Sequence, residues 1–276
     1  MRLFGGSDER LFMMMGGAKV EVMDMESEKK TIIEWFWCFQ LSNDDLTMIQ
    51  RRYGGSDNFL VVSWSDRKEG WIDCYNSSQK ILLVGEGDFS FSACLARAFG
   101  TAKNMVATWY LDEDCLVINH QTSLSHLEEL GRLGCVLMYQ IDVHKMHTHP
   151  ILKGMKFDII IFNFPHAGHI CYLREHDTEL IQKHKELVGA YFRNASKMLS
   201  EGGEVHIRHR DDSPYDRWDI VSLAVEAGLK LKEKVRFSES EYPGYIQRRG
   251  GGIKTDDTFP IGSPFTFKFA LDYTRR

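Results

Sequence analysis

The chain has 276 residues, of which 43% are hydrophobic and 26% charged, and this composition indicates a globular protein with one main domain. Its 34 Lys and Arg and 39 Asp and Glu side chains give a formal net charge of −5 at pH 7. That charge excludes a generally basic nucleic-acid binder, so contact with RNA would need a local basic patch.

Residues 1–76 form an N-terminal extension of unknown role. Its Trp35–Phe39 segment is densely aromatic, and Phe59–Trp64 has the composition of a strand. Stacking on nucleic-acid bases is one interpretation of this cluster, but we favour docking of an extra helix or strand. The apolar run at Met13–Met15 is too short for a signal peptide, and no stretch is long enough to span a membrane.

The cysteines lie singly along the chain, without any C-x-x-C pair. Scattered cysteines in a chain without a secretory segment predict free thiols in a reducing, intracellular compartment. They are Cys38, Cys74, Cys94, Cys115, Cys135 and Cys171.

Two glycines, Gly85 and Gly87, directly follow the apolar run Ile81–Val84, which is typical of a buried strand. Ser90 is expected to cap a helix that runs to Phe99. The glycines allow positive φ angles and the close approach of a ligand to the backbone. The segment therefore predicts the nucleotide-binding end of a Rossmann-like unit, although Ser90 replaces the third glycine of the full G-x-G-x-x-G pattern.

Three further strands are expected after this turn, and each ends in polar residues. They are Met105–Leu111, Cys135–Ile141 and Phe157–Phe162. The first closes on Asp112, Glu113 and Asp114, about 20 residues past the glycines, where a dinucleotide-binding fold holds ribose hydroxyls; a solvated strand end is the alternative. The second ends at Asp142, and the third is apolar enough for a central parallel strand.

Two helices and three more strands complete the expected order. They are Glu175–Leu199, Glu204–Arg208, Pro214–Ala227, Leu229–Phe237 and Phe265–Leu271. Gly202 and Gly203 are expected to stop the first helix, and Ser213 to cap the second. Parallel βα units that end in an antiparallel hairpin predict an α/β protein with a class I methyltransferase-like Rossmann fold and a mostly parallel sheet.

Four stretches between residues 79 and 269 resemble the 25S rRNA (uridine-N(3))-methyltransferase family. They are ILLVGEGDFSFSACLARAFG at 81–100, QIDVHKMHTH at 140–149, FDIIIFNFPHAG at 157–168 and YPGYIQRRG at 242–250. The resemblance implies that residues 77–276 form a Rossmann-like methyltransferase domain with S-adenosylmethionine as its cofactor. It also implies a uridine of large-subunit ribosomal RNA, or another structured RNA, as substrate, and a location in the nucleolus or cytoplasm.

Ligands of such a fold lie above the carboxyl ends of the parallel strands, where the glycine turn and the acids should converge. The expected cofactor-binding residues are Gly85, Glu86, Gly87, Asp88, Asp112, Asp142 and Val143. We favour Asp112 for the ribose and Asp142 for the adenine edge. The chain lacks the acid that many relatives of this fold carry just before the first glycine, so Glu86 or Asp88 is expected to replace it.

The expected catalytic residues are Asn163, Pro165 and His166. The run Asn163-Phe164-Pro165-His166 resembles the Asn-Pro-Pro-aromatic motif of amino-group methyltransferases, in which the Asn oxygen accepts a hydrogen bond from the target nitrogen and the fourth residue stacks on a flipped base. For uridine, Asn163 would orient the N3–H group, and His166 would stack or take the proton. The alternative is structural: Asn163 ends the strand and His166 packs beside Pro165.

A glycine-rich basic loop supplies the candidate RNA contacts, Arg248 and Arg249, with Arg208 expected nearby in the fold. A solvated loop is the alternative. In the strand that carries Arg208, HIRHR replaces a run that is more often similar to HVTHK in relatives.

Histidines are also dense at His144, His147 and His149, but these spacings suit no single regular element, and we expect no metal site. Neither a membrane nor an obligate protein partner is expected. Three other functions stay open: a catalytically inactive methyltransferase-fold binding protein, a histidine-based metal-binding protein, and, less favoured because of the closing hairpin, a nicotinamide dehydrogenase.

Overall fold

The chain divides into two compact units, residues 1–68 and 69–276. In the first unit, β1 (Arg2–Gly5), β2 (Leu11–Met15) and β3 (Ala18–Val22) form an antiparallel sheet in the order β1-β2-β3. The predicted aromatic cluster at Trp35–Phe39 and the predicted strand at Phe59–Trp64 lie outside the described residues. The computed structural model describes residues 2–5, 11–15, 18–22, 70–120, 122–249 and 256–275.

The second unit begins earlier than the sequence suggested. A short hairpin of β4 (Trp71–Ile72) and β5 (Tyr75–Asn76) belongs to it. Tyr75 is fully buried in the core of this unit, and its hydroxyl hydrogen-bonds His206 Nδ1 at 2.9 Å. The expected boundary at residue 77 is therefore too late, because it would separate a core side chain from its own domain.

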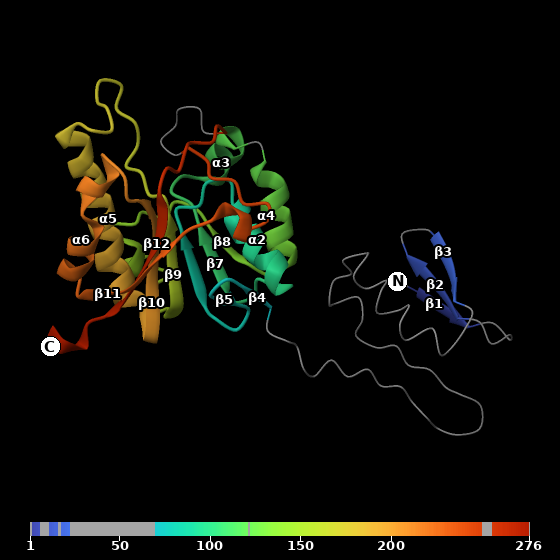
Figure 1. Cartoon of the computed structure of the whole chain (residues 1–276). Helices are drawn as coiled ribbons and strands as arrows, with labels where there is room; N and C mark the ends of the chain where they lie inside the picture. The colour runs from blue at the N-terminus through green and yellow to red at the C-terminus, as the bar shows by residue number, and fades with distance from the viewer. Residues whose placement is uncertain are drawn as a thin grey trace. The chain divides into compact units, whose positions relative to one another are not determined.

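Seven strands form the sheet of the second unit in the order β11-β12-β10-β9-β6-β7-β8 (Figure 1). Only β12 runs antiparallel to its neighbours, so the α/β class and the closing antiparallel strands are confirmed. The strands are β6 (Ile81–Val84), β7 (Met105–Thr108), β8 (Val136–Met138), β9 (Phe157–Asn163), β10 (Leu199–Arg210), β11 (Leu229–Arg236) and β12 (Pro264–Leu271).

Helices cover both faces of this sheet. The helices are α2 (Ser90–Phe99), α3 (Glu113–Asn119), α4 (Ser123–Arg132), α5 (Thr178–Met198) and α6 (Ile220–Glu226). Leu82 of β6 packs in the core cluster that includes α5 and α6, whereas its neighbour Leu83 packs in the cluster that includes α2 and α4 (Figure 1). Successive strand residues thus bury their side chains on opposite faces, which explains why β6 is wholly apolar and β9 is apolar from Ile159 to Phe162.

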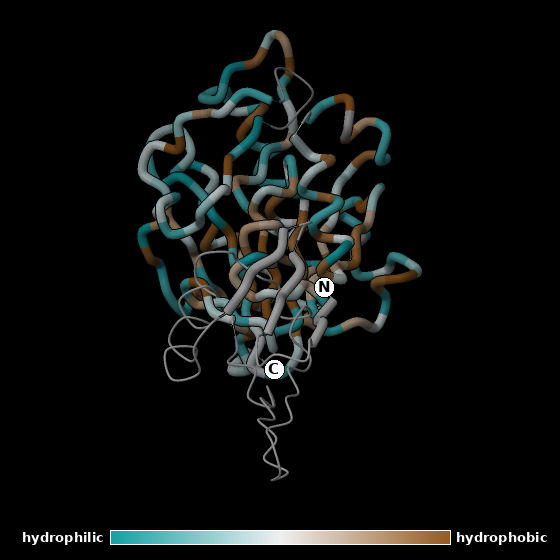
Figure 2. Tube along the Cα trace, turned by 90° about the vertical axis from the view of Figure 1, so that its right-hand side faces the viewer, coloured by the Kyte–Doolittle hydropathy of each residue, from teal (hydrophilic) through white to brown (hydrophobic). Residues whose placement is uncertain are grey.

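Hydrophobic stretches are dense in the middle of the second unit, and its outer loops mix hydrophilic with hydrophobic stretches (Figure 2). The chain order reverses between β6 and β9: β7 and β8 extend the sheet to one side of β6, and β10 extends it to the other side of β9. This reversal opens a crevice at the carboxyl ends of the two central strands, where ligands of open α/β sheets bind.

Some predicted element ends were wrong. Phe89, with φ 62°, is the residue before α2, and Ser90 does not cap the helix with its side chain. The predicted helix Pro214–Ala227 is broken, because Asp219 at φ 50° separates a 3₁₀ turn from α6 and caps α6 through Ser222 N. Gly202 does not stop α5; it lies in an irregularity of β10.

The predicted strand Met105–Leu111 ends at Thr108, because the next residues bond to the segment after β8: Gln140 donates its backbone N–H to the carbonyl of Leu111. None of the helices in the described part of the chain is both long and apolar enough to cross a membrane.

Candidate active site

A cavity of about 1100 Å³ opens at the carboxyl ends of the parallel strands. The glycine turn follows β6, Asn163 ends β9, and Asp142 follows β8, so residues far apart in sequence meet here. Asp112 and Arg208 are absent from the lining. The predicted site residues that do line it are Gly85, Glu86, Gly87, Asp88, Asp142, Val143, Asn163, Pro165, His166, Arg248 and Arg249.

The glycine turn is tightly packed. Gly85 has φ 61°, and a Cβ at this position would lie 2.6 Å from the Phe162 ring. A Cβ at Gly87 would lie 3.2 Å from the Cβ of Arg248. Position 85 therefore requires glycine for both backbone conformation and space, and position 87 has little room for any side chain.

The two acids of this turn have different environments. Glu86 is buried, and its Oε2 accepts hydrogen bonds from the Ser92 backbone N–H at 3.0 Å and the Ser92 hydroxyl at 2.6 Å. Burial raises the pKa of Glu86 to about 7. For Asp88, burial also acts to raise the pKa, but hydrogen bonds from Ser90 and Arg248 outweigh it and hold the pKa below its usual value.

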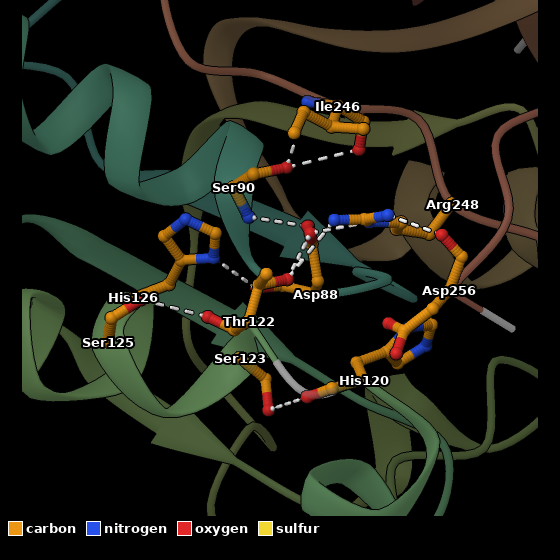
Figure 3. Close-up of polar contacts among 10 residues, drawn as sticks. All are labelled: Asp88, Ser90, His120, Thr122, Ser123, Ser125, His126, Ile246, Arg248 and Asp256. Carbon is orange, nitrogen blue, oxygen red and sulfur yellow. Dashed lines mark hydrogen bonds and ion pairs between the residues drawn. The ribbon is translucent and has the colours of Figure 1, made fainter.

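Arg248 clamps the segment 245–249 onto the glycine turn (Figure 3). Its Nε donates to Asp88 Oδ2 at 2.8 Å, Nη2 contacts the Thr122 hydroxyl at 3.2 Å, and Nη1 donates to the Asp256 carbonyl. The Ser90 hydroxyl adds a second link, since it donates to the Ile246 carbonyl and accepts from the Ile246 N–H, both at 3.1 Å. The Arg248 side chain is only 11% exposed. Although Arg248 was predicted to contact RNA, its guanidinium instead makes hydrogen bonds within the protein that hold the loop.

The acids that follow β7 do not line the cavity. Asp112 is exposed and caps α3 by accepting a hydrogen bond from Cys115 N at 2.8 Å, and this bond lowers its pKa. Glu113 accepts a hydrogen bond from the Tyr139 hydroxyl at 3.1 Å. The cavity is lined here by Tyr110 and Leu111 instead.

Asp142 and Val143 lie together at the cavity. One oxygen of Asp142 accepts hydrogen bonds from both the backbone N and Nδ1 of His144, each at 2.9 Å, and Val143 is buried in the core. His147 Nδ1 instead contacts Asn194 of α5. His144 and His147 thus serve different local contacts.

Asn163 lies directly beside Arg208, its partner in the parallel pairing of β9 and β10. Arg208 Nη1 donates to Asn163 Oδ1 at 2.6 Å. The prediction that Arg208 contacts RNA is wrong, because its side chain is fully buried. The guanidinium lies 4.4 Å from the Phe91 ring centre and 4.7 Å from that of Phe237, and these aromatic faces attract the cation in place of water.

Three histidines surround Glu175 at the cavity. His166 Nε2 lies 3.0 Å from Glu175 Oε1, His184 Nε2 lies 3.5 Å from Oε2, and His169 Nδ1 lies 3.9 Å from Oε1. His166 and His184 lower the pKa of Glu175 well below its usual range. Burial lowers the pKa of His184, and burial together with His166 lowers that of His169, so both favour the neutral form.

His166, Glu175 and His184 are spaced closely enough to hold a metal ion, since their ligand atoms lie within 4.8 Å of one another. However, backbone N–H groups of Gly168 and Ala167 donate to Nδ1 of His166 and His184, each at 3.1 Å. A neutral ring that accepts at Nδ1 carries its proton on Nε2. Metal-binding histidines show the opposite arrangement, with the second nitrogen donating. We therefore interpret this cluster as a hydrogen-bonded network with both Nε2–H groups directed at Glu175.

This sheet order, the glycine turn after β6 and the polar cavity at the reversal point together define a class I methyltransferase fold. Residues 82–249 match the family described as rRNA (uridine-N3-)-methyltransferase BTM5-like. The chain belongs to this family.

Relatives from plants and yeast match this chain at different levels of sequence identity. An uncharacterized Arabidopsis thaliana protein is 46% identical over 202 residues, covering 73% of this chain and 97% of that protein. The heavy metal-associated isoprenylated plant protein 41 of Arabidopsis is 44% identical, and the match spans 73% of this chain but 39% of that protein. The 25S rRNA (uridine(2634)-N(3))-methyltransferase of Saccharomyces cerevisiae is 26% identical, covering 66% and 69%.

Among solved structures, a methyltransferase from Pyrococcus furiosus covers 89% of this chain and 98% of its own, with a TM-score of 0.43 and 15% identity. S-adenosylmethionine is the cofactor of class I methyltransferases, and the cavity fits it: Gly85 and Gly87 leave the backbone accessible, and Glu86 presents a buried carboxyl.

Several site residues were not expected from the sequence. Glu175 and His184 come from the loop and helix after β9, and only their distances in the fold reveal the histidine cluster. His169, which also belongs to the cluster, was not among the predicted site residues. The one available signal was the density of histidines on both sides of Asn163.

Proposed function

We propose that this protein transfers the methyl group of S-adenosylmethionine to N3 of a uridine in large-subunit ribosomal RNA. The observation that supports this most strongly is one cavity in which the glycine turn, Asn163 and the histidine cluster meet. The family description and the name of the yeast relative support the nucleobase and the RNA class. Action in the nucleolus or cytoplasm is part of the proposal.

We propose that Gly85, Gly87 and Glu86 hold the methionine part of the cofactor, and that Asp142 with Val143 contacts its adenine. When bound, the cofactor supplies an electrophilic methyl group on a sulfonium that leaves readily. The protein then has to place the uracil ring and accept its N3 proton, because positioning supplies much of the rate in such a transfer. Asp112 stays our prediction for the residue that binds the ribose of the cofactor. Because Asp112 does not line the cavity, the bound cofactor would have to extend beyond the lining residues to reach it.

We propose two roles for the histidines at the cavity, stacking on the base and accepting its N3 proton. Both nitrogens of His166 are engaged, one by Gly168 N–H and one by Glu175, so we propose that this ring stacks on the base beside Pro165. His169 is 30% exposed, and its lowered pKa keeps a lone pair free near neutral pH. We therefore propose His169 as the acceptor of the N3 proton.

Arg249 is the proposed contact for RNA phosphate. It lines the cavity, and its Nε is buried without a hydrogen-bond partner in the described residues. A guanidinium with an unused donor suits a phosphate oxygen.

The deciding experiment is nucleoside mass spectrometry of ribosomal RNA from cells that lack the protein, with a rescue by the wild-type chain. We expect loss of N3-methyluridine and its return on rescue. Unchanged N3-methyluridine, with S-adenosylmethionine binding retained by the purified protein, would contradict the proposed substrate and favour a binding protein.

A further inference from the structure

Asn163 has a fixed amide orientation. Arginine carries only donors, so the Asn163 atom that lies 2.6 Å from Arg208 Nη1 is the oxygen. Among the described residues, the Asn163 nitrogen, Nδ2, makes no hydrogen bond, and it is not a buried polar atom that lacks a partner. Since Asn163 lines the cavity, its NH₂ group is the part of the amide left for a ligand.

The surroundings of Arg208 keep this orientation in place. Its Nη2 donates to the Tyr242 hydroxyl at 2.8 Å, and that hydroxyl donates in turn to Asp73 Oδ2 at 2.7 Å. The side chain is fully buried, so a flip of the Asn163 amide would set donor against donor and deprive Nη1 of this buried cation of its acceptor. Arg208 is therefore a positioning residue for Asn163.

We infer that Asn163 acts as a hydrogen-bond donor and selects a base by a carbonyl oxygen beside the reacting nitrogen, here O4 of uracil. This inference deepens the proposed function and rests on it. Uracil carries the acceptor O4 beside N3, where cytosine carries a donor amino group, and adenine also presents an amino group at this edge. The role is the reverse of the one expected from the Asn-Pro-Pro-aromatic resemblance, in which the oxygen accepts from the target.

Two substitutions at one position test the donor role in the full-length protein. Asn163→Asp keeps an acceptor for Arg208 but has no donor, and Asn163→Ala has neither. We expect both to lower methyl transfer to ribosomal RNA at least about 100-fold, with Asp no better than Ala. An Asp variant at least tenfold more active than the Ala variant would overturn the inference, because an acceptor alone would then suffice.

Binding gives a measurement that does not depend on transfer. With S-adenosylhomocysteine present, the wild type should bind hexauridine about tenfold or more tightly than hexacytidine. Arg208→Met frees the amide to turn and should abolish this preference while cofactor affinity is retained, whereas Arg208→Lys, which keeps a donor, should restore part of it. Equal binding of the two RNAs by the wild type overturns the inference; uridine preference without any methyl transfer instead contradicts only the proposed function.

Discussion

Two of the carboxylates at the cavity, Asp88 and Glu175, differ in how many hydrogen bonds the protein donates to them. Asp88 accepts from Ser90 N, Thr122 and Arg248, so both of its oxygens are used. Oε2 of Glu175 is buried, and the His184 Nε2 that faces it lies 3.5 Å away, at the long end of the range for a hydrogen bond. We infer that the polar contacts of the glycine-turn side are complete, whereas the contact of Glu175 with His184 on the histidine side can still shorten when a ligand binds.

The largest effect is expected at Asp88, because both of its oxygens already accept hydrogen bonds within the protein. Asp88→Asn turns an acceptor into a donor that faces Arg248 and should lower the free energy of unfolding by about 3 kcal/mol. Denaturant titration measures this, with Glu129→Gln as the control, because the more exposed pair of Glu129 with Arg97 should be worth less than about 1 kcal/mol. Equal losses in the two variants would show that Asp88 is not a structural clamp.

Glu86 tests the comparison through the pH dependence of the free energy of unfolding. Its folded pKa of about 7 lies above the ordinary glutamate pKa of 4.5, so folding favours the protonated carboxyl. This stability is fully present below about pH 4.5 and is lost as pH rises through 7. Glu86→Gln removes this loss, so its stability relative to wild type should rise by about 3 kcal/mol between pH 4.5 and 8. A pH-independent difference would mean that the carboxyl is not desolvated.

On the histidine side, Glu175→Gln should lower methyl transfer about tenfold at unchanged cofactor affinity. The amide nitrogen would oppose an Nε2–H group of His166 or His184 and turn one ring out of place. Single-turnover kinetics with saturating cofactor measures the chemical step, and the unfolding free energy serves as the check that the fold is intact. Full activity in this variant would show that the cluster does not position the base.

The smallest effect is expected at Arg249. Arg249→Ala should reduce the slope of log affinity for RNA against log salt by about 1 and leave cofactor binding unchanged. The exposed Lys230 on β11, which does not line the cavity, provides the control, since Lys230→Ala should leave the slope as it is. An identical slope for wild type and Arg249→Ala would assign the phosphate contact to other residues.

The sheet was predictable where burial alone determines the residue type. Ile81–Val84 and Ile159–Phe162 are apolar because both faces are covered, and the glycine at 85 follows from a turn that admits no Cβ. Strand ends and helix caps were less predictable. Asp112 and Asp219 cap α3 and α6 because the local backbone conformation brings each carboxylate to a backbone N–H group.

The polar contacts of the site could not be read from the sequence. Arg208 looks like a surface arginine in an alternating strand, and only the aromatic rings from α2 and from the segment after β11 explain its burial. Likewise, Arg248 and Arg249 are neighbours of the same type, yet only Arg248 meets the buried Asp88. Such differences depend on partners more than 100 residues away.

The β4–β5 hairpin has a practical consequence for anyone who expresses the second unit alone. A recombinant fragment that starts at residue 77 would lack Asp73, the acceptor for the Tyr242 hydroxyl, and Tyr75, a fully buried core side chain. It would loosen Arg208 and, through it, Asn163, and so lose activity for a reason unrelated to the extension. A fragment that starts at residue 69 keeps these contacts and isolates the contribution of the first 68 residues.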